Sequence, residues 1–228
     1  MHIWRKEWKI ARTICLNKSD NHAPTPNQLR PISMLPTFSK IYERLFLIRF
    51  NSWSYKMNIL PSQQSGARSH QATISRINCL LEQMTQSQRY NSFIPVVYID
   101  FLQAFDKLWH QGLLPNLKRL DCSSSYLVWL ANYFSNRTLK IDYGGVVSTL
   151  INVERGAHQG SCLGPVMYVI SHHDLPQCFR DPTHVHAYVD DIAIAYVPSI
   201  HLKYKLQVVE IEERINNDIL MLRQYAND

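Results

Sequence analysis

Residues 185–197 read VHAYVDDIAIAYV, two short apolar runs with the pair Asp190-Asp191 between them. Such runs predict two strands joined by a turn that carries the acidic pair. The segment 94–101, IPVVYIDF, is another short apolar run, and Asp100 lies near its end. Its composition is typical of a buried strand. The sequence therefore predicts a small sheet with carboxylates at its strand ends.

Asp100, Asp190 and Asp191 are conspicuous because only 18% of the residues are charged. A carboxylate buried in an apolar strand is costly unless it gains an ion partner, a metal or a proton. No Lys or Arg neighbours these three in the sequence, so one interpretation is that two strand ends meet around divalent cations such as Mg²⁺. The other is that Asp190-Asp191 is an ordinary turn pair and that Asp100 caps the next helix.

The order of the acidic residues separates two classes of phosphotransfer fold. A receiver-type domain has its acidic pair first and a single Asp later. Here the single Asp100 comes first, and the pair follows 90 residues later. This order argues against a receiver and favours a polymerase palm.

The remaining patterns predict helices and one further hairpin. Residues 138–153 alternate on either side of Gly144-Gly145, which is a hairpin signal. Residues 17–36, rich in Pro, Asn and Ser, are expected to be extended or looped. Apolar spacing predicts helices over residues 38–50, 71–87, 107–120, 124–135, 163–171 and 202–224. This order of elements predicts an α+β fold.

Size and composition are those of a folded chain. The 228 residues suit one domain or two small ones, and 46% of them are hydrophobic. The net charge of +6 raises the chance of a polyanionic partner, although a plain basic surface is equally compatible. Five irregularly spaced cysteines predict a reducing, intracellular setting, in the nucleus or cytoplasm. A zinc cluster of Cys178, His184 and His186 is an alternative, but its spacing matches no standard zinc pattern.

Five segments, in the family's order, resemble motifs of reverse transcriptases from non-LTR retrotransposons of the LINE-type, Jockey-like kind. They are LRPISMLP at 29–36 with SKIYERL at 39–45, QSGAR at 64–68, DFLQAFD at 100–106, RGAHQGSCLGP at 155–165, and YVDD at 188–191. The resemblance implies the fingers and palm of a right-hand polymerase, an α+β fold with a ferredoxin-like palm and added helices. Residues 1–93 would form the fingers region, and residues 94–228 the palm region with interleaved fingers and helical elements.

The resemblance also implies RNA-directed DNA polymerase activity, in which a primer 3′-hydroxyl attacks a dNTP under two Mg²⁺ ions, with Mn²⁺ as an alternative. Asp100 and Asp190 would hold the two ions, and Asp191 would assist nearby. The backbone carbonyl of Phe101 would complete the metal shell.

For the incoming dNTP, the resemblance implies contacts from four residues. Phe105 would stack under the sugar and fill the space of a 2′-hydroxyl. Gln159 and the Gly160 backbone would contact the nucleotide from the other side, and Arg30 would neutralise its triphosphate. Each also has a plain structural interpretation, namely a core aromatic, a loop residue, a turn former and a surface cation.

Arg68 and Tyr188 are expected to contact the template RNA and the DNA primer. Other cations that could line such a cleft are Lys40, Arg44, Arg49 and Arg137, although scattered cations usually form a solvated surface. Neither a membrane segment nor an obligate protein partner is expected. Asp106 is expected to serve structure, for example by capping its helix.

The sequence departs from the family pattern in several places. His158 replaces a proline that fixes the nucleotide-facing loop, and Ala67 replaces an aromatic residue. The chain ends 37 residues after Asp191, so we expect no thumb, and no endonuclease domain is expected at the N-terminus. The isolated chain is therefore expected to be feeble or inactive. The alternatives are a non-catalytic retroelement remnant that at most binds nucleic acid, and a two-metal nuclease, which has no use for Phe105 or Gln159.

Overall fold

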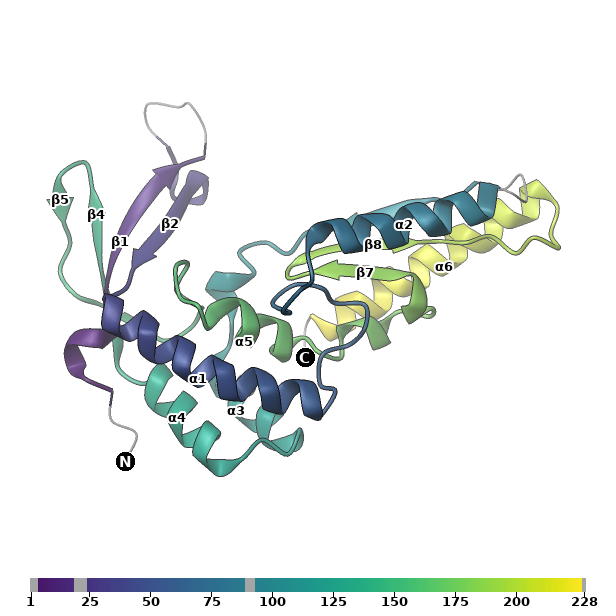
Figure 1. The fold of residues 1–228 in the computed structure, drawn as a ribbon. Coiled ribbons are helices and arrows are strands. Elements are labelled where there is room, and N and C mark those ends of the chain that lie inside the picture. The colour runs from purple at the N-terminus through teal and green to yellow at the C-terminus, as the bar shows by residue number, and fades with distance from the viewer. Residues whose placement is uncertain (1–3, 19–23, 89–92, 227–228) are drawn as a thin grey trace. The chain divides into compact units, whose positions relative to one another are not determined.

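The computed structural model describes residues 4–18, 24–88 and 93–226 (Figure 1). The chain forms two compact units, and each is built from two separate segments. Unit 1 comprises Met1–Ile59 and Gln103–Ser171, and unit 2 comprises Leu60–Leu102 and His172–Asp228. Neither unit ends between residues 93 and 94. The assignment of 1–93 to fingers and 94–228 to palm stays a prediction, because compact packing alone does not define these regions.

Unit 1 contains a sheet in the order β2-β1-β4-β5, in which β6 also pairs with β4. Its strands are β1 (Ile10–Asn17), β2 (Leu29–Met34), β4 (Arg137–Tyr143), β5 (Val146–Val147) and β6 (Ile151–Val153). β1 pairs antiparallel with β2 and parallel with β4. β1 has no counterpart among the predicted elements, and β2 lies in the segment expected to be extended or looped.

The hairpin predicted around the glycine pair is confirmed, since β4 pairs antiparallel with β5. Gly144 and Gly145 have φ values of 59° and 81°, the left-handed conformation that a two-residue turn of this kind requires.

The helices of unit 1 are α1 (Thr37–Lys56), α3 (His110–Arg119), α4 (Ser124–Phe134) and α5 (Gly164–Ser171), with the 3-10 turn η3 (Phe105–Lys107) before α3. These positions confirm the helices predicted for this part of the sequence. α1 and α4 pack through aromatic side chains: the rings of Phe46 and Trp129 stack with centroids 3.7 Å apart. Leu130 of α4 and Met167 of α5 are fully buried in the same unit.

Unit 2 contains a three-stranded antiparallel sheet in the order β3-β8-β7. Its strands are β3 (Val96–Ile99), β7 (Val185–Tyr188) and β8 (Asp191–Ala195), and its helices are α2 (Thr73–Gln88) and α6 (Tyr204–Tyr225). The predicted hairpin with the acidic turn and the two predicted helices are thereby confirmed.

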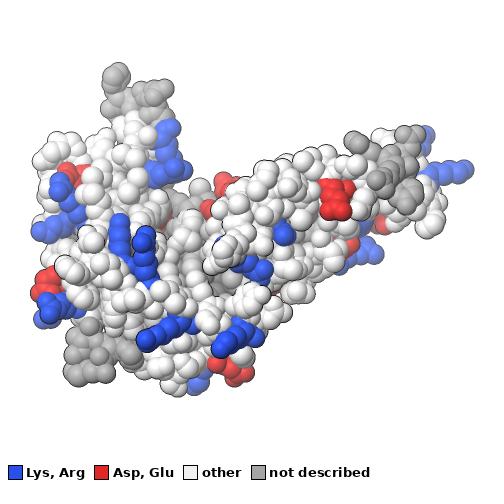
Figure 2. Space-filling view, in the orientation of Figure 1, with Lys and Arg blue, Asp and Glu red and all other residues white. Residues whose placement is uncertain are grey.

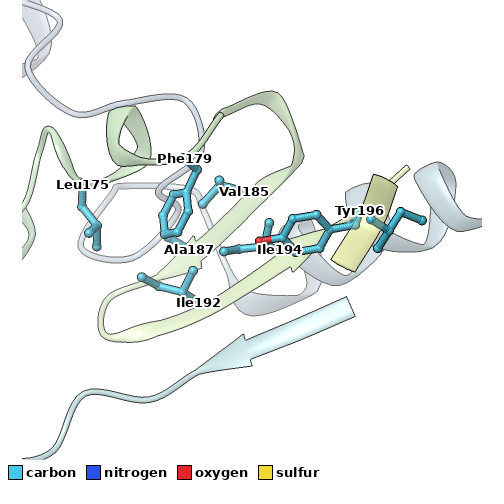
Figure 3. Packing of buried hydrophobic residues seen from close by; sticks show 8 residues of the cluster. Leu175, Phe179, Val185, Ala187, Ile192, Ile194 and Tyr196 are labelled. Carbon is cyan, nitrogen blue, oxygen red and sulfur yellow. The ribbon is translucent and has the colours of Figure 1, made fainter. Parts of the chain in front are cut away.

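The sheet of unit 2 lies between α2 and α6 (Figure 1). The core on the α6 side is formed by Leu175, Phe179, Val185, Ala187, Ile192, Ile194, Tyr196 and Ile211 (Figure 3). His186 lies between Val185 and Ala187 in β7 and so points to the opposite face. There its Nε2 is 3.0 Å from Oε1 of Gln83 in α2.

A strand is present near residues 94–101, as β3, but the prediction that this strand is buried is wrong. β3 is at the edge of its sheet, and the side chain of Tyr98 has 74% of its surface exposed. None of the helices within the described ranges is both long and apolar enough to span a bilayer.

Candidate active site

The three acidic residues lie at one end of the unit 2 sheet. Ile99 of β3 pairs with Ile192 of β8 in antiparallel register. Asp100 follows Ile99 and Asp191 precedes Ile192, so the register brings these two aspartates opposite each other. Asp190 lies in the hairpin turn, beside the pair formed by Tyr188 and Asp191. The predicted meeting of two acidic strand ends is therefore present in the backbone arrangement.

The electrostatics of Asp190 reflect this arrangement. Burial raises the pKa of Asp190, and the negative charges of Asp191 and Asp100 raise it further. Asp190 is half-buried, whereas Asp100 and Asp191 are exposed. The cost of burying a carboxylate therefore concerns Asp190, because Asp100 and Asp191 lie where their strands emerge into solvent.

Across the described residues, no three His, Cys, Asp or Glu side chains are grouped so as to hold a metal ion, and the zinc alternative has no such cluster to rest on. Mg²⁺ differs from zinc because it is commonly bound through one or two carboxylates, with water and substrate phosphates completing its shell. The paired acidic strand ends fit such a cation in donor chemistry and in charge, since a divalent ion would relieve the repulsion that raises the pKa of Asp190.

The turn that carries Asp190 has a conformation that sequence reasoning missed. Val189 has a φ of 59°, which is rare for a β-branched residue. The side-chain amide of Gln64 bonds to both backbone groups of Val189: Oε1 accepts from the Val189 N–H at 2.8 Å, and Nε2 donates to the Val189 carbonyl at 3.1 Å. The only sequence signal was the position of Gln64 in the QSGAR segment.

The residues predicted to contact the dNTP lie in unit 1. The Gln159 carbonyl accepts from the Ser33 N–H in β2 at 2.8 Å. Gly160 has a φ of 135°, and a Cβ there would collide with the carbonyl oxygen of Ser33. The Phe105 carbonyl accepts from the N–H of Ala157 at 2.7 Å. Phe105, Gln159 and Gly160 therefore belong to one connected region of unit 1.

Phe105 is half-buried, with its ring centroid 5.4 Å from that of Tyr168. Arg30 is exposed on β2. Asp106 does not cap η3, whose N-cap is Ala104 with no side-chain cap bond. Its carboxylate instead accepts from Nε2 of Gln159 at 3.3 Å, so Asp106 orients the amide of a predicted nucleotide contact.

His158, which stands in place of the family's proline, is buried in unit 1. Burial, followed by the charges of Arg137 and His110, lowers the pKa of His158 to about 4. The imidazole is therefore neutral at physiological pH, and it occupies interior space beside the loop of Gln159 and Gly160 instead of facing a nucleotide as a cation.

The predicted nucleic-acid contacts are mixed in outcome. Arg137 is wrong as a cleft residue: it is 2% exposed, its Nε donates to the Tyr133 carbonyl at 2.6 Å, and its guanidinium lies over the Tyr133 ring. Arg68 is half-buried and donates to the carbonyl of Leu60. Tyr188 is half-buried at the end of β7. On the face shown in Figure 2, Lys and Arg side chains form separate groups among mostly uncharged residues.

Comparison with known proteins points to one family. Residues 16–217 match the model of the family described as reverse transcriptase (RNA-dependent DNA polymerase). The probable RNA-directed DNA polymerase from transposon BS of Drosophila melanogaster is 33% identical over 203 residues, which is 86% of this chain and 22% of that protein. The corresponding protein from transposon X-element is 30% identical over 193 residues, 83% of this chain and 21% of that protein.

The RNA-directed DNA polymerase from the Drosophila melanogaster mobile element jockey is 29% identical over 195 residues. The chain spans about a fifth of the length of these curated relatives. Among solved structures, apo telomerase from Candida tropicalis superposes on 95% of this chain and 48% of its own, with a TM-score of 0.55 at 11% identity. These matches confirm the predicted resemblance and the predicted polymerase fold.

Proposed function

Because the chain belongs to the reverse transcriptase family, we propose that it catalyses RNA-directed DNA synthesis, the transfer of a nucleotide from a dNTP to a primer 3′-hydroxyl. The observation that supports this most directly is the placement of Asp100 opposite Asp191, with Asp190 in the adjoining turn. Their charges act on one another, as the raised pKa of Asp190 indicates. Two carboxylates whose charges act on Asp190 at the same strand end support a proposed cation site, whereas an ordinary turn pair would involve Asp190 and Asp191 without Asp100.

Reverse transcriptases generally use divalent metal ions, and we propose that Asp100 and Asp190 hold two Mg²⁺ ions, with Asp191 and the Phe101 carbonyl assisting. When bound, such ions lower the pKa of an attacking hydroxyl and stabilise the leaving oxygen. The protein's own contribution is to keep these carboxylates adjacent before substrate arrives. Asp190 must lose its proton to bind a cation, so its raised pKa makes metal binding weaken as the pH falls.

Phe105, Gln159, Gly160 and Arg30 are proposed to contact the dNTP. Phe105 is only half-buried, which leaves ring surface for a sugar, and its backbone is fixed by the bond to Ala157. The close approach of Gly160 to Ser33 requires the absence of a side chain. The exposed guanidinium of Arg30 suits a triphosphate, since its planar fork matches phosphate oxygens.

Template RNA and a DNA primer are the proposed macromolecular partners, with Arg68 and Tyr188 among the contacts and with action inside the cell, in the nucleus or cytoplasm. Because the Arg68 guanidinium already donates to the Leu60 carbonyl, its proposed role includes fixing the local backbone as well as attracting phosphate.

Primer extension on poly-rA/oligo-dT with Mg²⁺ tests the proposal. We expect weak incorporation by the parent chain, as its expected lack of a thumb requires, and none by Asp190→Asn. Asp121→Asn is the matched control, because Asp121 is exposed in unit 1 and has a φ of 56°, a conformation that Asn also adopts readily. Template binding without incorporation by the parent would favour a non-catalytic remnant and refute the proposal.

A further inference from the structure

The turn between β7 and β8 is held in an unfavourable conformation. It contains only Val189 and Asp190, because Tyr188 and Asp191 on either side are paired. A φ of 59° at the first position of a two-residue turn normally belongs to glycine, and a branched Cβ makes it costly for Val189. Something outside the turn must hold it, because Val189 alone would favour a different backbone.

Gln64 supplies that restraint. Its side chain is buried, with 7% of its surface exposed. The two ends of its amide match the two backbone groups of Val189, with Oε1 2.8 Å from the Val189 nitrogen and Nε2 3.1 Å from the Val189 oxygen. This two-point contact fixes the plane of the peptide groups on both sides of Val189 and therefore the direction in which the chain enters Asp190.

The backbone around Gln64 is itself anchored to β7. The Ser65 N–H donates to the Ala187 carbonyl at 2.9 Å, and the Ala187 N–H donates to the Gln63 carbonyl at 2.9 Å. Gln64 and Ala187 form a parallel bridge. The Gln64 amide is thus carried on a segment registered against the strand that leads into the turn, so it cannot shift without disturbing that register.

Gly66 completes the arrangement. Its N–H donates to Oε1 of Gln64 at 2.7 Å, so the oxygen that receives the Val189 N–H is held from a second side. A Cβ at Gly66 would lie 2.5 Å from Cγ2 of Val189 and would also collide with the Val189 nitrogen. The segment therefore approaches the turn as closely as a glycine backbone permits.

We propose that Gln64 is a positioning residue for nucleotide transfer, which holds the strained turn at Val189 and thereby aims the carboxylate of Asp190. The proposal rests on the proposed function for its catalytic consequence. Gln64 itself touches neither metal nor substrate in this role. In metal sites generally, residues that do not bind the metal themselves hold the metal ligands in their orientation. Gln64 would do this for Asp190 through the backbone of Val189.

The test compares Gln64→Met, which keeps the length of the side chain and removes its polar ends, with Gln63→Met. Gln63 is a matched control because, within the described part of the chain, its side-chain amide is hydrogen-bonded only to the exposed Ser62 hydroxyl. Its backbone bond to Ala187 survives substitution. Each change is also made together with Val189→Gly, since glycine adopts the turn conformation without help.

The first measurement is hydrogen exchange at the Val189 amide, which needs no activity. We expect Gln64→Met to accelerate exchange at Val189 while the amides of Ile192 and Ile194 stay as protected as in the parent. Gln63→Met should leave all three unchanged. Equal protection of Val189 in the parent and in Gln64→Met would overturn the proposal.

The second measurement is Mn²⁺ affinity together with kcat and KM in primer extension. We expect Gln64→Met to lower Mn²⁺ affinity and kcat by about tenfold to a hundredfold, as for other residues behind metal ligands, with KM for primer-template little changed. Val189→Gly should restore most of this loss in the Gln64→Met background. The positioning role of Gln64 would be overturned if Gln64→Met lowered Mn²⁺ affinity and kcat no more than Gln63→Met does. It would also be overturned if Val189→Gly restored none of the loss. A parent chain that incorporates no nucleotide would refute the proposed function, while Val189 exchange would still decide whether Gln64 holds the turn.

Discussion

Removal of the Glu43 carboxylate should destabilise unit 1 strongly. Glu43 lies on α1 with none of its surface exposed. Its Oε2 accepts from the Ser161 hydroxyl at 2.8 Å, from the Cys162 N–H at 2.8 Å and from the Leu163 N–H at 3.4 Å. These groups directly precede α5, so the carboxylate satisfies donors at a helix N-terminus, where negative charge is favoured.

The expected loss follows from these bonds. A hydrogen bond to a charged group contributes about 1.5–3 kcal/mol, and two of the three bonds are short. The opposing term is the cost of burying the charge, since the Glu43 side chain is fully buried. Glu43→Ala removes the cost of burying the charge, but it leaves the Ser161, Cys162 and Leu163 donors unpaired. We therefore expect it to lower the free energy of unfolding of unit 1 by about 2–4 kcal/mol.

Tryptophan fluorescence during urea unfolding is the suitable assay, because all five tryptophans lie in the segments of unit 1. Arg44→Ala is the matched control on the same helix; Arg44 is exposed, and its loss should change stability by less than about 0.5 kcal/mol. Glu43→Gln, which keeps an acceptor oxygen, should lie between the two. An unfolding curve for Glu43→Ala that overlays that of Arg44→Ala would refute the reasoning.

Three further outcomes are expected. Asp190→Asn should stabilise unit 2 at neutral pH. In the parent, the raised pKa of Asp190 makes unit 2 lose stability as the pH rises from 3.8 through that pKa, and Asn has no proton to lose. Hydrogen exchange of the β8 amides across this pH range measures the difference. His158→Gln should flatten the pH dependence of the free energy of unfolding of unit 1. In the parent, folding lowers the His158 pKa from 6.5 to about 4, so unit 1 loses about 3 kcal/mol of stability as the pH falls through that window. Tryptophan-monitored unfolding at pH 7 and pH 4.5 checks this. The same change in the free energy of unfolding between the two pH values in parent and variant would contradict it. Phe105→Ala should admit ribonucleotides in primer extension if Phe105 excludes a 2′-hydroxyl; unchanged sugar selectivity would speak against that role.

The hairpin of β7 and β8 was predictable because its information is local. The run 185–197 contains both strands and the turn, so pairing needs no distant partner. β1 gave no such signal: it pairs antiparallel with β2 and parallel with β4, and β4 is more than 100 residues away. The Pro, Asn and Ser content of residues 17–36 left open whether this segment is extended or looped. β2 forms there at the edge of its sheet, where Pro31, a residue without an N–H, is tolerated.

The acidic residues of the site were predictable from their chemistry, but the groups that hold them were not. Asp100 and Asp190 are unusual in an apolar sequence, whereas Gln64 is an ordinary polar residue until its amide is seen against Val189, 125 positions away. Arg137 shows the opposite failure. Its charge suggests solvent or phosphate, but its guanidinium is buried over the ring of Tyr133, and nothing in the neighbouring residues announces that packing.

Glu43 and Gln64 solve the same physical problem in different units. Each is a polar side chain buried where an apolar residue would fill space more cheaply, and each bonds to backbone groups of a loop that carries a proposed functional residue. An apolar side chain at position 64 would leave the packing of Ile192 and Ile194 intact, because those residues face α6, but it would release Val189 to relax. Hydrophobic packing alone therefore specifies the sheet without specifying the turn. The direction of the Asp190 carboxylate depends on one buried amide, and stability and geometry at this site are set by different residues.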